Sequence, residues 1–292
     1  MIRNTRDGSR RAPYLRTDIN MGNVTTLPPS SRGPRGDERA IHEALLAAGF
    51  QGLQGGNPKL CRELGLGCTG SGRINQPHEA DNLAREHRDA GYEGSTLHVA
   101  WGLESDAEVD RLVEAIIAAA ERYDYPLYIE THRATITQDI YRTVQLCQRL
   151  PEVRFNGDFS HWYTGLEMVY GGIDQKLAFA QPVFDRVRFL HGRIGTPGCI
   201  QVDIGDGTNR PYVDHFREMW TRSFLGFLRS AQPGDFICFN PELLPPSIYY
   251  ARVFPNAQGE LVEEGDRYQQ ALLYAQLARD CFAEAQRRLA AG

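Results

Sequence analysis

From about residue 90 onward, the sequence alternates short apolar runs with longer stretches of helical periodicity, and this alternation limits the folds open to the chain. The runs are rich in β-branched and aromatic residues, as strands are, and they cover residues 96–101, 127–131, 153–158, 187–191 and 236–240. Helices are predicted at about 105–122, 137–149, 174–185, 212–231 and 265–290. Because parallel strands need long crossover connections, usually helical, the pattern indicates βα units around a parallel sheet.

The first 90 residues show the same pattern less clearly. Strands are predicted at 14–21, 50–54 and 66–69, and helices at about 37–48, 58–64 and 77–90. Eight strands and eight helices in 292 residues fit a closed (β/α)8 TIM barrel of the α/β class better than an open doubly wound sheet. We therefore expect residues 13–292 to form a single barrel domain. Residues 1–12 are arginine-rich without an apolar stretch, and we expect a flexible N-terminal tail there.

The composition of the chain limits the classes of molecule that it can bind. The net charge of -5 provides no basic surface for nucleic-acid phosphates, so no nucleic-acid partner is expected. No apolar run approaches the roughly 20 residues of a membrane helix, so no membrane partner is expected either. The six cysteines lack CxxC spacing, and without an export signal we expect reduced thiols and a cytoplasmic location. The remaining partner class is a small molecule, and because barrels often associate through their outer helices, a homo-oligomer is also compatible with the sequence.

Gly65, Gly67 and Gly70 satisfy the G-x-G-x-x-G pattern of dinucleotide-binding folds. The motif does not open a helix, because residues 71–77 intervene, and no acidic residue ends the next strand to hold a ribose. We therefore reject a dinucleotide site.

Acidic residues and histidines gather at the ends of the late predicted strands. In a TIM barrel these ends form the C-terminal mouth, where active sites assemble, and residues two apart on a strand share a side. The residues in question are His98, Glu130, His132, Asp158, His161, His191, Arg193 and Glu242. Three carboxylates and one imidazole, from Glu130, Asp158, Glu242 and His191, suit one hard divalent ion such as Mn²⁺, Mg²⁺ or Co²⁺, and Zn²⁺ is also compatible.

Four short motifs carry a resemblance to a known family. They are YIETH at 128–132, D-x-x-H at 158–161, FLHGR at 189–193 and NPE at 240–242. In this order they resemble the xylose isomerase-like TIM barrels, which include ketose 3-epimerases, hydroxypyruvate-type isomerases and apurinic-site endonucleases. The resemblance covers residues 90–285 well.

The resemblance implies roles for individual residues. Glu130, Asp158, His191 and Glu242 would bind the metal, and the two glutamates would also form the catalytic acid/base pair. His161 and Arg193 match positions that hold substrate hydroxyls, although in the epimerase branch the arginine usually lies further beyond the histidine. From their places at the rim, we add His98, His132 and Trp101 as candidates for substrate contact, Trp101 as an apolar wall against the substrate carbon chain.

The predicted activity is isomerisation or epimerisation of a small sugar, ketose or related hydroxy acid by proton transfer through an enediolate. One alternative is a metal-dependent lyase or hydratase acting on an oxidised (3-oxo) sugar, which begins with the same proton removal. A second alternative is an apurinic-site endonuclease. That activity needs further histidine ligands, but strand two ends in Gln54, and Asp214 and His215 are adjacent rather than spaced as D-x-H.

Overall fold

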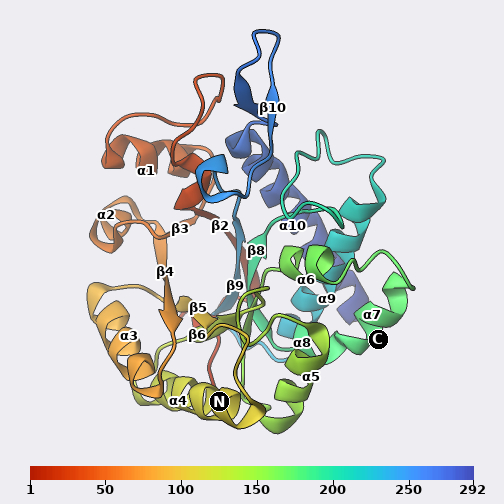
Figure 1. Ribbon diagram of the computed structural model, residues 1–292. Helices are drawn as coiled ribbons and strands as arrows, with labels where there is room; N and C mark the ends of the chain where they lie inside the picture. Colours follow the sequence, from red (N-terminus) through yellow and green to blue (C-terminus); the bar gives the residue numbers. More distant parts are fainter.

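The computed structural model describes residues 1–292 and shows a closed barrel of parallel strands surrounded by helices (Figure 1). The barrel strands follow chain order around the ring, and β9 pairs in parallel with both β8 and β2 to close it. They are β2 (Tyr14–Asn20), β3 (Gly52–Gln54), β4 (Gly67–Ile74), β5 (Ser95–Val99), β6 (Leu127–Glu130), β7 (Phe155–Gly157), β8 (Val187–Gly192) and β9 (Asp235–Pro241). The predicted (β/α)8 TIM barrel is confirmed.

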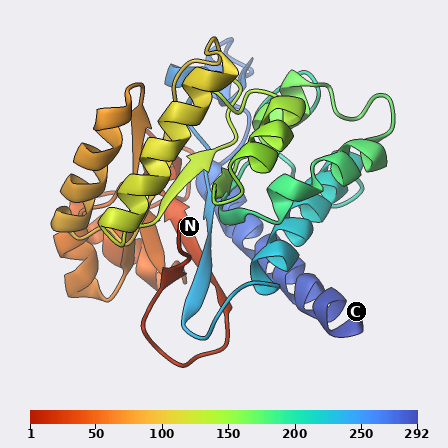
Figure 2. The same ribbon diagram turned by 90° about the horizontal axis from the view of Figure 1, so that it is seen from below.

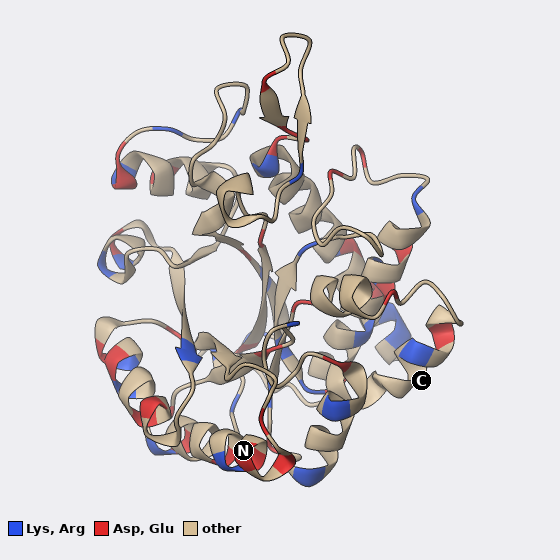
Figure 3. Ribbon diagram, viewed as in Figure 1, with Lys and Arg blue, Asp and Glu red and all other residues tan.

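Helices cover the outside of this barrel, as Figure 2 shows from a second direction. They are α1 (Glu38–Ala47), α2 (Pro58–Leu64), α3 (Pro77–Ala90), α4 (Asp106–Arg122), α5 (Ile140–Arg149), α6 (Ser160–Gly165), α7 (Ile173–Phe179), α8 (Gln181–Phe184), α9 (Pro211–Leu228) and α10 (Arg267–Ala291). In α4, Ser105 and Glu108 form a capping box, and Val109, Val113 and Ile116 lie buried on one face. Figure 3 shows that the charged residues of α3 and α4 lie on the outside of the molecule.

Two apolar clusters fill the space between strands and helices. The larger contains 55 buried residues and extends along the later strands and their helices. The smaller contains 11, among them Ile19 of β2 and Leu53 of β3, and lies beneath α1, α2 and α10. Part of the barrel interior is instead polar: Gln54 of β3 is hydrogen-bonded to Thr96 of β5 and to His191 of β8. The core therefore supports the strands from outside and leaves their inner side chains available for chemistry.

Two long connections after late strands contain secondary structure. Residues 159–173 include the short helix α6, which begins directly after β7 without a side-chain cap. Residues 241–264 include a hairpin of β10 (Val253–Pro255) and β11 (Leu261–Glu263), which projects from the body in Figure 1. The helix predicted at 174–185 is divided into α7 and α8, with Pro182 in the first turn of α8, where a proline is tolerated.

The N-terminal segment differs from the expected loose tail. Residues Thr5–Arg6 form the short strand β1, which pairs antiparallel with the start of β9. Ile2 is buried in the main apolar cluster, and the hydroxyl of Thr5 lies 3.0 Å from that of Tyr128. Part of the segment predicted as a tail therefore covers the N-terminal end of the barrel, because Ile2 has an apolar surface to bury there.

The glycine-rich segment of the second and third βα units supplies close packing. Gly65 ends α2 in the left-handed conformation, and Gly67 and Gly70 lie in β4. A Cβ at Gly67 would lie 2.4 Å from Nη1 of Arg16, so a side chain there would displace the arginine. None of the three opens a helix, as expected for a chance match to the dinucleotide motif. No helix in the structure has the length and apolar character needed to cross a bilayer.

Candidate functional site

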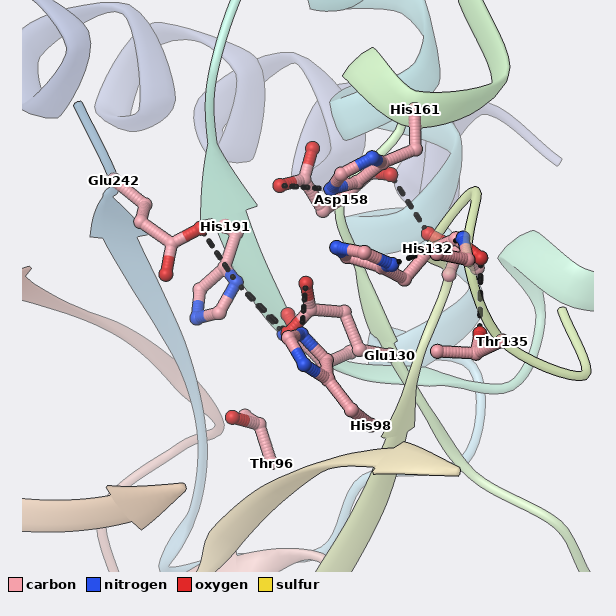
Figure 4. A network of polar contacts seen from close by, with 12 residues as sticks. Thr96, His98, Glu130, His132, Thr135, Asp158, His161, His191 and Glu242 are labelled. Carbon is pink, nitrogen blue, oxygen red and sulfur yellow. Dashed lines mark hydrogen bonds and ion pairs between the residues drawn. The ribbon is translucent and has the colours of Figure 1, made fainter. Parts of the chain in front are cut away.

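Four side chains from four successive strands meet at the C-terminal mouth of the barrel (Figure 4). Glu130 ends β6, Asp158 follows β7, His191 lies in β8 and Glu242 follows β9. Each of the four residues offers one ligand atom, and these four atoms all lie within 4.8 Å of one another. Nδ1 of His191 lies 3.2 Å from Oε2 of Glu130 and 3.3 Å from Oε2 of Glu242. The structure thus brings together the four residues predicted to bind a metal.

Negative charge exceeds positive charge in this cluster. Glu130, Asp158 and Glu242 bring three carboxylates, and Arg193 is the one guanidinium that contacts them. With His191 neutral, as a metal ligand must be, the imbalance amounts to two negative charges in a place where Glu130 and Asp158 are fully or almost fully buried. Burying unpaired charge is unfavourable. A divalent cation matches both the oxygen-rich donor set and the excess charge, so the residues present fit a metal ion.

The pKa values of these residues reflect the same imbalance of charge. Burial alone would lower the pKa of His191, but the carboxylates of Glu242 and Glu130 outweigh it and raise that pKa to about 9. Burial likewise opposes ionisation of Glu130, yet His191 and His98 hold its pKa well below the usual range. Burial raises the pKa of Glu242. The two glutamates therefore differ in proton affinity, which is the arrangement that a base and an acid require.

A hydrogen-bond chain orients the imidazole of His191. Its Nε2 lies 2.7 Å from Oε1 of Gln54, which is an acceptor, so this nitrogen carries a proton. Gln54 donates to Thr96 at 2.9 Å, and Asn20 donates to both Gln54 and Glu242. These contacts turn Nδ1 of His191 toward the carboxylates. Partners of this kind hold metal-binding histidines in the required orientation.

Arg193 and Ser160 hold the carboxylate of Asp158. Ser160 donates to Oδ1 through its backbone N–H at 3.1 Å and its hydroxyl at 2.5 Å. Arg193 lies 3.1 Å from Oδ2 and also pairs with Glu242, while the ring of Tyr250 covers its guanidinium at 4.3 Å. Arg193 is buried against these carboxylates, which differs from the expectation that it mainly contacts the substrate. Its Nη1 has no partner, so a contact with a substrate hydroxyl stays a prediction.

Three histidine rings form a stack beside Glu130. The ring of His132 lies between those of His98 and His161, with centroid separations of 4.3 and 3.8 Å. Nδ1 of His132 accepts a hydrogen bond from the backbone N–H of Ala134 at 3.1 Å, so Nε2 carries the proton. Burial lowers the pKa of His132 to about 3 and that of His161 well below its usual range. Both rings are therefore neutral hydrogen-bonding groups at neutral pH.

A second possible trio of metal ligands, His98, Glu130 and His132, is less suitable. Nε2 of His132 is protonated in the tautomer described above, and a protonated nitrogen has no lone pair to give. Nε2 of His98 lies 3.2 Å from Oε1 of Glu130, and the His98 side chain is 36% exposed. His98 thus marks the side of the cluster that is open to solvent.

Trp101 lies at the rim and outside the cluster. Its side chain is 57% exposed, and its ring lies 4.0 Å from the guanidinium carbon of Arg73. Its predicted contact with the substrate stays a prediction. The sequence motifs did not indicate Asn20, Gln54 and Arg73 as parts of the site. All three lie at or near the ends of β2, β3 and β4, the strands whose pattern was weakest, and their position before a helical segment was the available signal.

Comparisons with known proteins identify the fold. No protein-family model matches the chain, and no curated protein is similar in sequence. Among solved structures, the probable 3-DHS dehydratase AsbF from Bacillus anthracis matches with a TM-score of 0.55 and 13% identity, over 90% of this chain and 98% of that one. A xylose isomerase-like TIM barrel protein from Mycobacterium smegmatis, solved in complex with magnesium, matches with a TM-score of 0.54 and 12% identity, over 94% and 98%.

A D-tagatose 3-epimerase-like protein matches with a TM-score of 0.50 and 10% identity, over 95% of this chain and 98% of that one. This chain has the fold of the xylose isomerase-like TIM barrels. The matches cover 90% and 94% of the chain, so they include most of residues 1–90, for which the sequence motifs gave little information. The xylose isomerase-like fold thus places the clustered carboxylates at the mouth where active sites of TIM barrels assemble.

Proposed function

We propose that this protein is a divalent-metal-dependent isomerase or epimerase of a small sugar, ketose or related hydroxy acid. The observation that carries the proposal is the cluster of Glu130, Asp158, His191 and Glu242, whose ligand atoms lie within 4.8 Å and whose charge calls for a divalent cation. These four residues would hold Mn²⁺, Mg²⁺ or Co²⁺. When bound, the ion supplies electrostatic stabilisation of the oxygen charge that develops when a carbon next to a carbonyl loses a proton.

The two glutamates divide the proton transfers. In the proposed reaction Glu130 accepts the proton at a carboxylate oxygen, and the electron pair of the broken C–H bond enters the enediolate. Glu242 returns a proton from its own carboxyl oxygen. Return to the opposite face of the same carbon gives epimerisation. Return to the adjacent carbon, with a proton moved from one oxygen of the enediolate to the other, exchanges aldose and ketose. A final proton exchange with solvent restores both carboxyl groups.

The histidine stack supplies neutral contacts for the substrate. Nε2 of His132 is a donor that carries no charge. His161 is fully buried, neither of its ring nitrogens has a hydrogen-bond partner, and its Nε2 lies 3.6 Å from Oδ2 of Asp158. Neutral imidazoles can hold hydroxyl and carbonyl oxygens without competing for the cation. His161 and His132 are therefore the proposed substrate-binding residues, and His98 is placed at the edge where substrate enters.

A lyase or hydratase acting on an oxidised (3-oxo) sugar is a second candidate. It starts with the same proton removal and then loses a hydroxide from the next carbon, which needs a proton donor beside the base. The N–H of His132, in a ring stacked between His98 and His161 beside Glu130, favours this alternative. The similarity in fold to AsbF, described as a probable 3-DHS dehydratase, agrees with it.

Isotope exchange tests both candidates. The protein is loaded with Mn²⁺ and incubated in D2O with ketoses, aldoses and 3-oxo sugars, and products are analysed by NMR. Deuterium on a carbon next to a carbonyl in a rearranged sugar supports the isomerase, whereas loss of water identifies the lyase. Exhaustive chelation should abolish the exchange and added metal restore it. Exchange that survives complete metal removal contradicts the proposal.

An endonuclease assay separates the remaining alternative. Gln54, at the end of β3, is hydrogen-bonded to His191 and Thr96, so it gives no further metal ligand of the kind that an apurinic-site endonuclease needs. We expect no nicking of a DNA duplex that contains an abasic site. Metal-dependent nicking at that site would replace the isomerase proposal with the endonuclease.

A further inference from the structure

Arg73 is a cation without an acidic partner at the edge of the candidate site. It lies near the end of β4, in register with His98 of β5. Its guanidinium contacts the carbonyl of Ala100 at 2.6 Å and Nδ1 of His98 at 3.4 Å, and it forms no ion pair with any Asp or Glu of the chain. Arg193, by contrast, is engaged by Asp158 and Glu242. A free guanidinium therefore lies on the side of the site that is open to solvent.

The turn after β5 holds this guanidinium in place. Ala100 adopts a φ of 50°, in the left-handed region that a residue with a side chain rarely occupies. Glu104 accepts hydrogen bonds from the backbone N–H groups of Trp101, Gly102 and Leu103. This turn places the Trp101 ring against the Arg73 guanidinium at 4.0 Å. Backbone strain of this kind is concentrated at functional sites, because other contacts must maintain it.

The contacts leave part of the guanidinium free. Two of its five N–H groups point to Ala100 and His98, and three remain, enough for the paired hydrogen bonds that arginine forms with a carboxylate. His98 separates Arg73 from Glu130 by a single imidazole ring. A group bound to Arg73 would thus lie at one end of a substrate whose other end reaches the proposed metal site.

We propose that Arg73, supported by Trp101 and His98, binds a carboxylate of the substrate, so that the substrate class is a polyhydroxy acid rather than a neutral sugar. The reaction assumed for this substrate rests on the proposed function, whereas the contact between Arg73 and the carboxylate does not depend on it. A carboxylate is favoured over a phosphate ester because Glu104, Asp106 and Glu108 follow directly along the chain, and they repel a doubly charged group more strongly.

Direct binding tests the contact. D-gluconate and D-glucitol have the same carbon chain and differ in one terminal group, a carboxylate against a hydroxymethyl. Calorimetric titration into the Mn²⁺-loaded protein should show gluconate binding about tenfold to a hundredfold more tightly, as expected for hydrogen bonds to a charged group. Arg73→Gln should remove this preference. Arg73→Lys should keep part of it, because lysine retains the charge and loses the paired geometry.

Two controls make the result specific. Arg133 is also at the mouth and unpaired, but it is exposed and forms no hydrogen bond in the structure, so Arg133→Gln should leave the preference unchanged. D-glucitol 6-phosphate should bind more weakly than gluconate. The proposal is overturned if gluconate binds no more tightly than glucitol, if Arg73→Gln keeps the preference, if Arg133→Gln removes it, or if the phosphate ester binds more tightly.

Metal titration separates this inference from the proposed function. Arg73→Gln should bind Mn²⁺ as the unmodified protein does, because Arg73 contacts none of the four proposed ligands. If the unmodified protein binds no Mn²⁺ while metal-free protein still prefers gluconate through Arg73, the metal-dependent function fails and the carboxylate site stands. If Mn²⁺ binds and the preference is absent, the reverse conclusion holds.

Discussion

Both ends of the barrel bury charged side chains, but they balance the charges differently. Toward the N-terminal end, Arg16 makes hydrogen bonds with Asp18 at 2.7 to 3.1 Å and with Glu93 at 2.8 Å. Space for these groups comes from Gly52 and Gly67, where a Cβ would lie within about 2.6 Å of them. At the mouth, three carboxylates share one arginine. At the lower end the second carboxylate, Glu93, is 39% exposed, so solvent shares its charge, whereas the mouth buries two of its three carboxylates and has oxygen donors left for a ligand.

This difference separates a structural role from a functional one. A buried ion pair whose partners are all present fixes local geometry, and removing one member leaves an uncompensated charge. A cluster with excess charge is unfavourable for the fold and is maintained where a ligand completes it. We therefore expect substitutions at the two ends to affect different measurements.

The largest effect is expected on turnover at the mouth. Glu130→Gln and Glu242→Gln each remove a proton-transfer group, and the rate should fall by about a hundredfold to ten-thousandfold. The unfolding temperature of the metal-free protein should change little, because each substitution removes one excess negative charge but also one partner of His191. Turnover is measured by the isotope-exchange assay, with Glu114→Gln on the exposed face of α4 as the matched control. Normal turnover in either mouth variant would remove the acid/base assignment.

The opposite pattern is expected at the lower end. Asp18→Asn leaves Arg16 buried with half of its partners and should lower the free energy of unfolding by about 3 to 5 kcal/mol. Binding of Mn²⁺ by the protein that remains folded should be unchanged. Denaturant unfolding checks the first expectation, and Asp89→Asn, at an exposed pair with Arg88, should change stability by less than about 0.5 kcal/mol. Equal losses of unfolding free energy in Asp18→Asn and Asp89→Asn would contradict the structural role of Arg16 and Asp18.

A smaller effect is expected from the hydrogen-bond chain behind His191. Gln54→Leu removes the acceptor for Nε2 of His191, and affinity for Mn²⁺ should fall about tenfold to a hundredfold. Gln269→Leu, on an exposed position of α10, should leave the affinity unchanged. The affinity is measured by titration calorimetry. An unchanged affinity in Gln54→Leu would mean that Gln54 does not orient the ligand.

The most gradual effect is expected with pH. In the metal-free protein the pKa of His191 is raised to about 9, above its ordinary value of 6.5. The stability contributed by its proton is therefore complete below about pH 6.5 and is lost as pH rises toward 9. A metal must displace that proton, so affinity for Mg²⁺ should rise about tenfold per pH unit in this window. Unfolding and Mg²⁺ titrations at several pH values check both trends, and a flat profile would contradict them.

Sequence periodicity predicted the barrel because most helices and strands have one buried face. The predicted helices at 58–64 and 77–90 have the bounds seen in the structure. Strand β4 was predicted only to residue 69, because its later residues include Gly70 and Gly72. A Cβ at Gly72 would lie 2.2 Å from Leu83 of α3, so the glycine is required by tight packing that a single sequence does not reveal.

The candidate site was predictable where acidic residues and histidines lie at the ends of strands with a clear hydrophobic pattern. Glu130, Asp158, His191 and Glu242 meet because adjacent parallel strands bring their ends to one rim. Partners from the other side of the barrel were not predictable. Gln54 reaches His191 across the interior, from a strand of three residues with little pattern, and Tyr250 covers Arg193 from a long connection. Such contacts depend on the closed geometry and not on neighbouring sequence.

The hydrogen bond between Gln54 and His191 joins β3 to β8, two strands that are not neighbours in the ring. The position of His191, a proposed metal ligand, is therefore set directly by the width of the barrel at this level. Any substitution that moves β3 inward or outward will shift that ring without passing through an intermediate residue. Substitutions in the early strands, whose sequence pattern is weak, can thus change the geometry of the candidate site as effectively as substitutions beside the substrate.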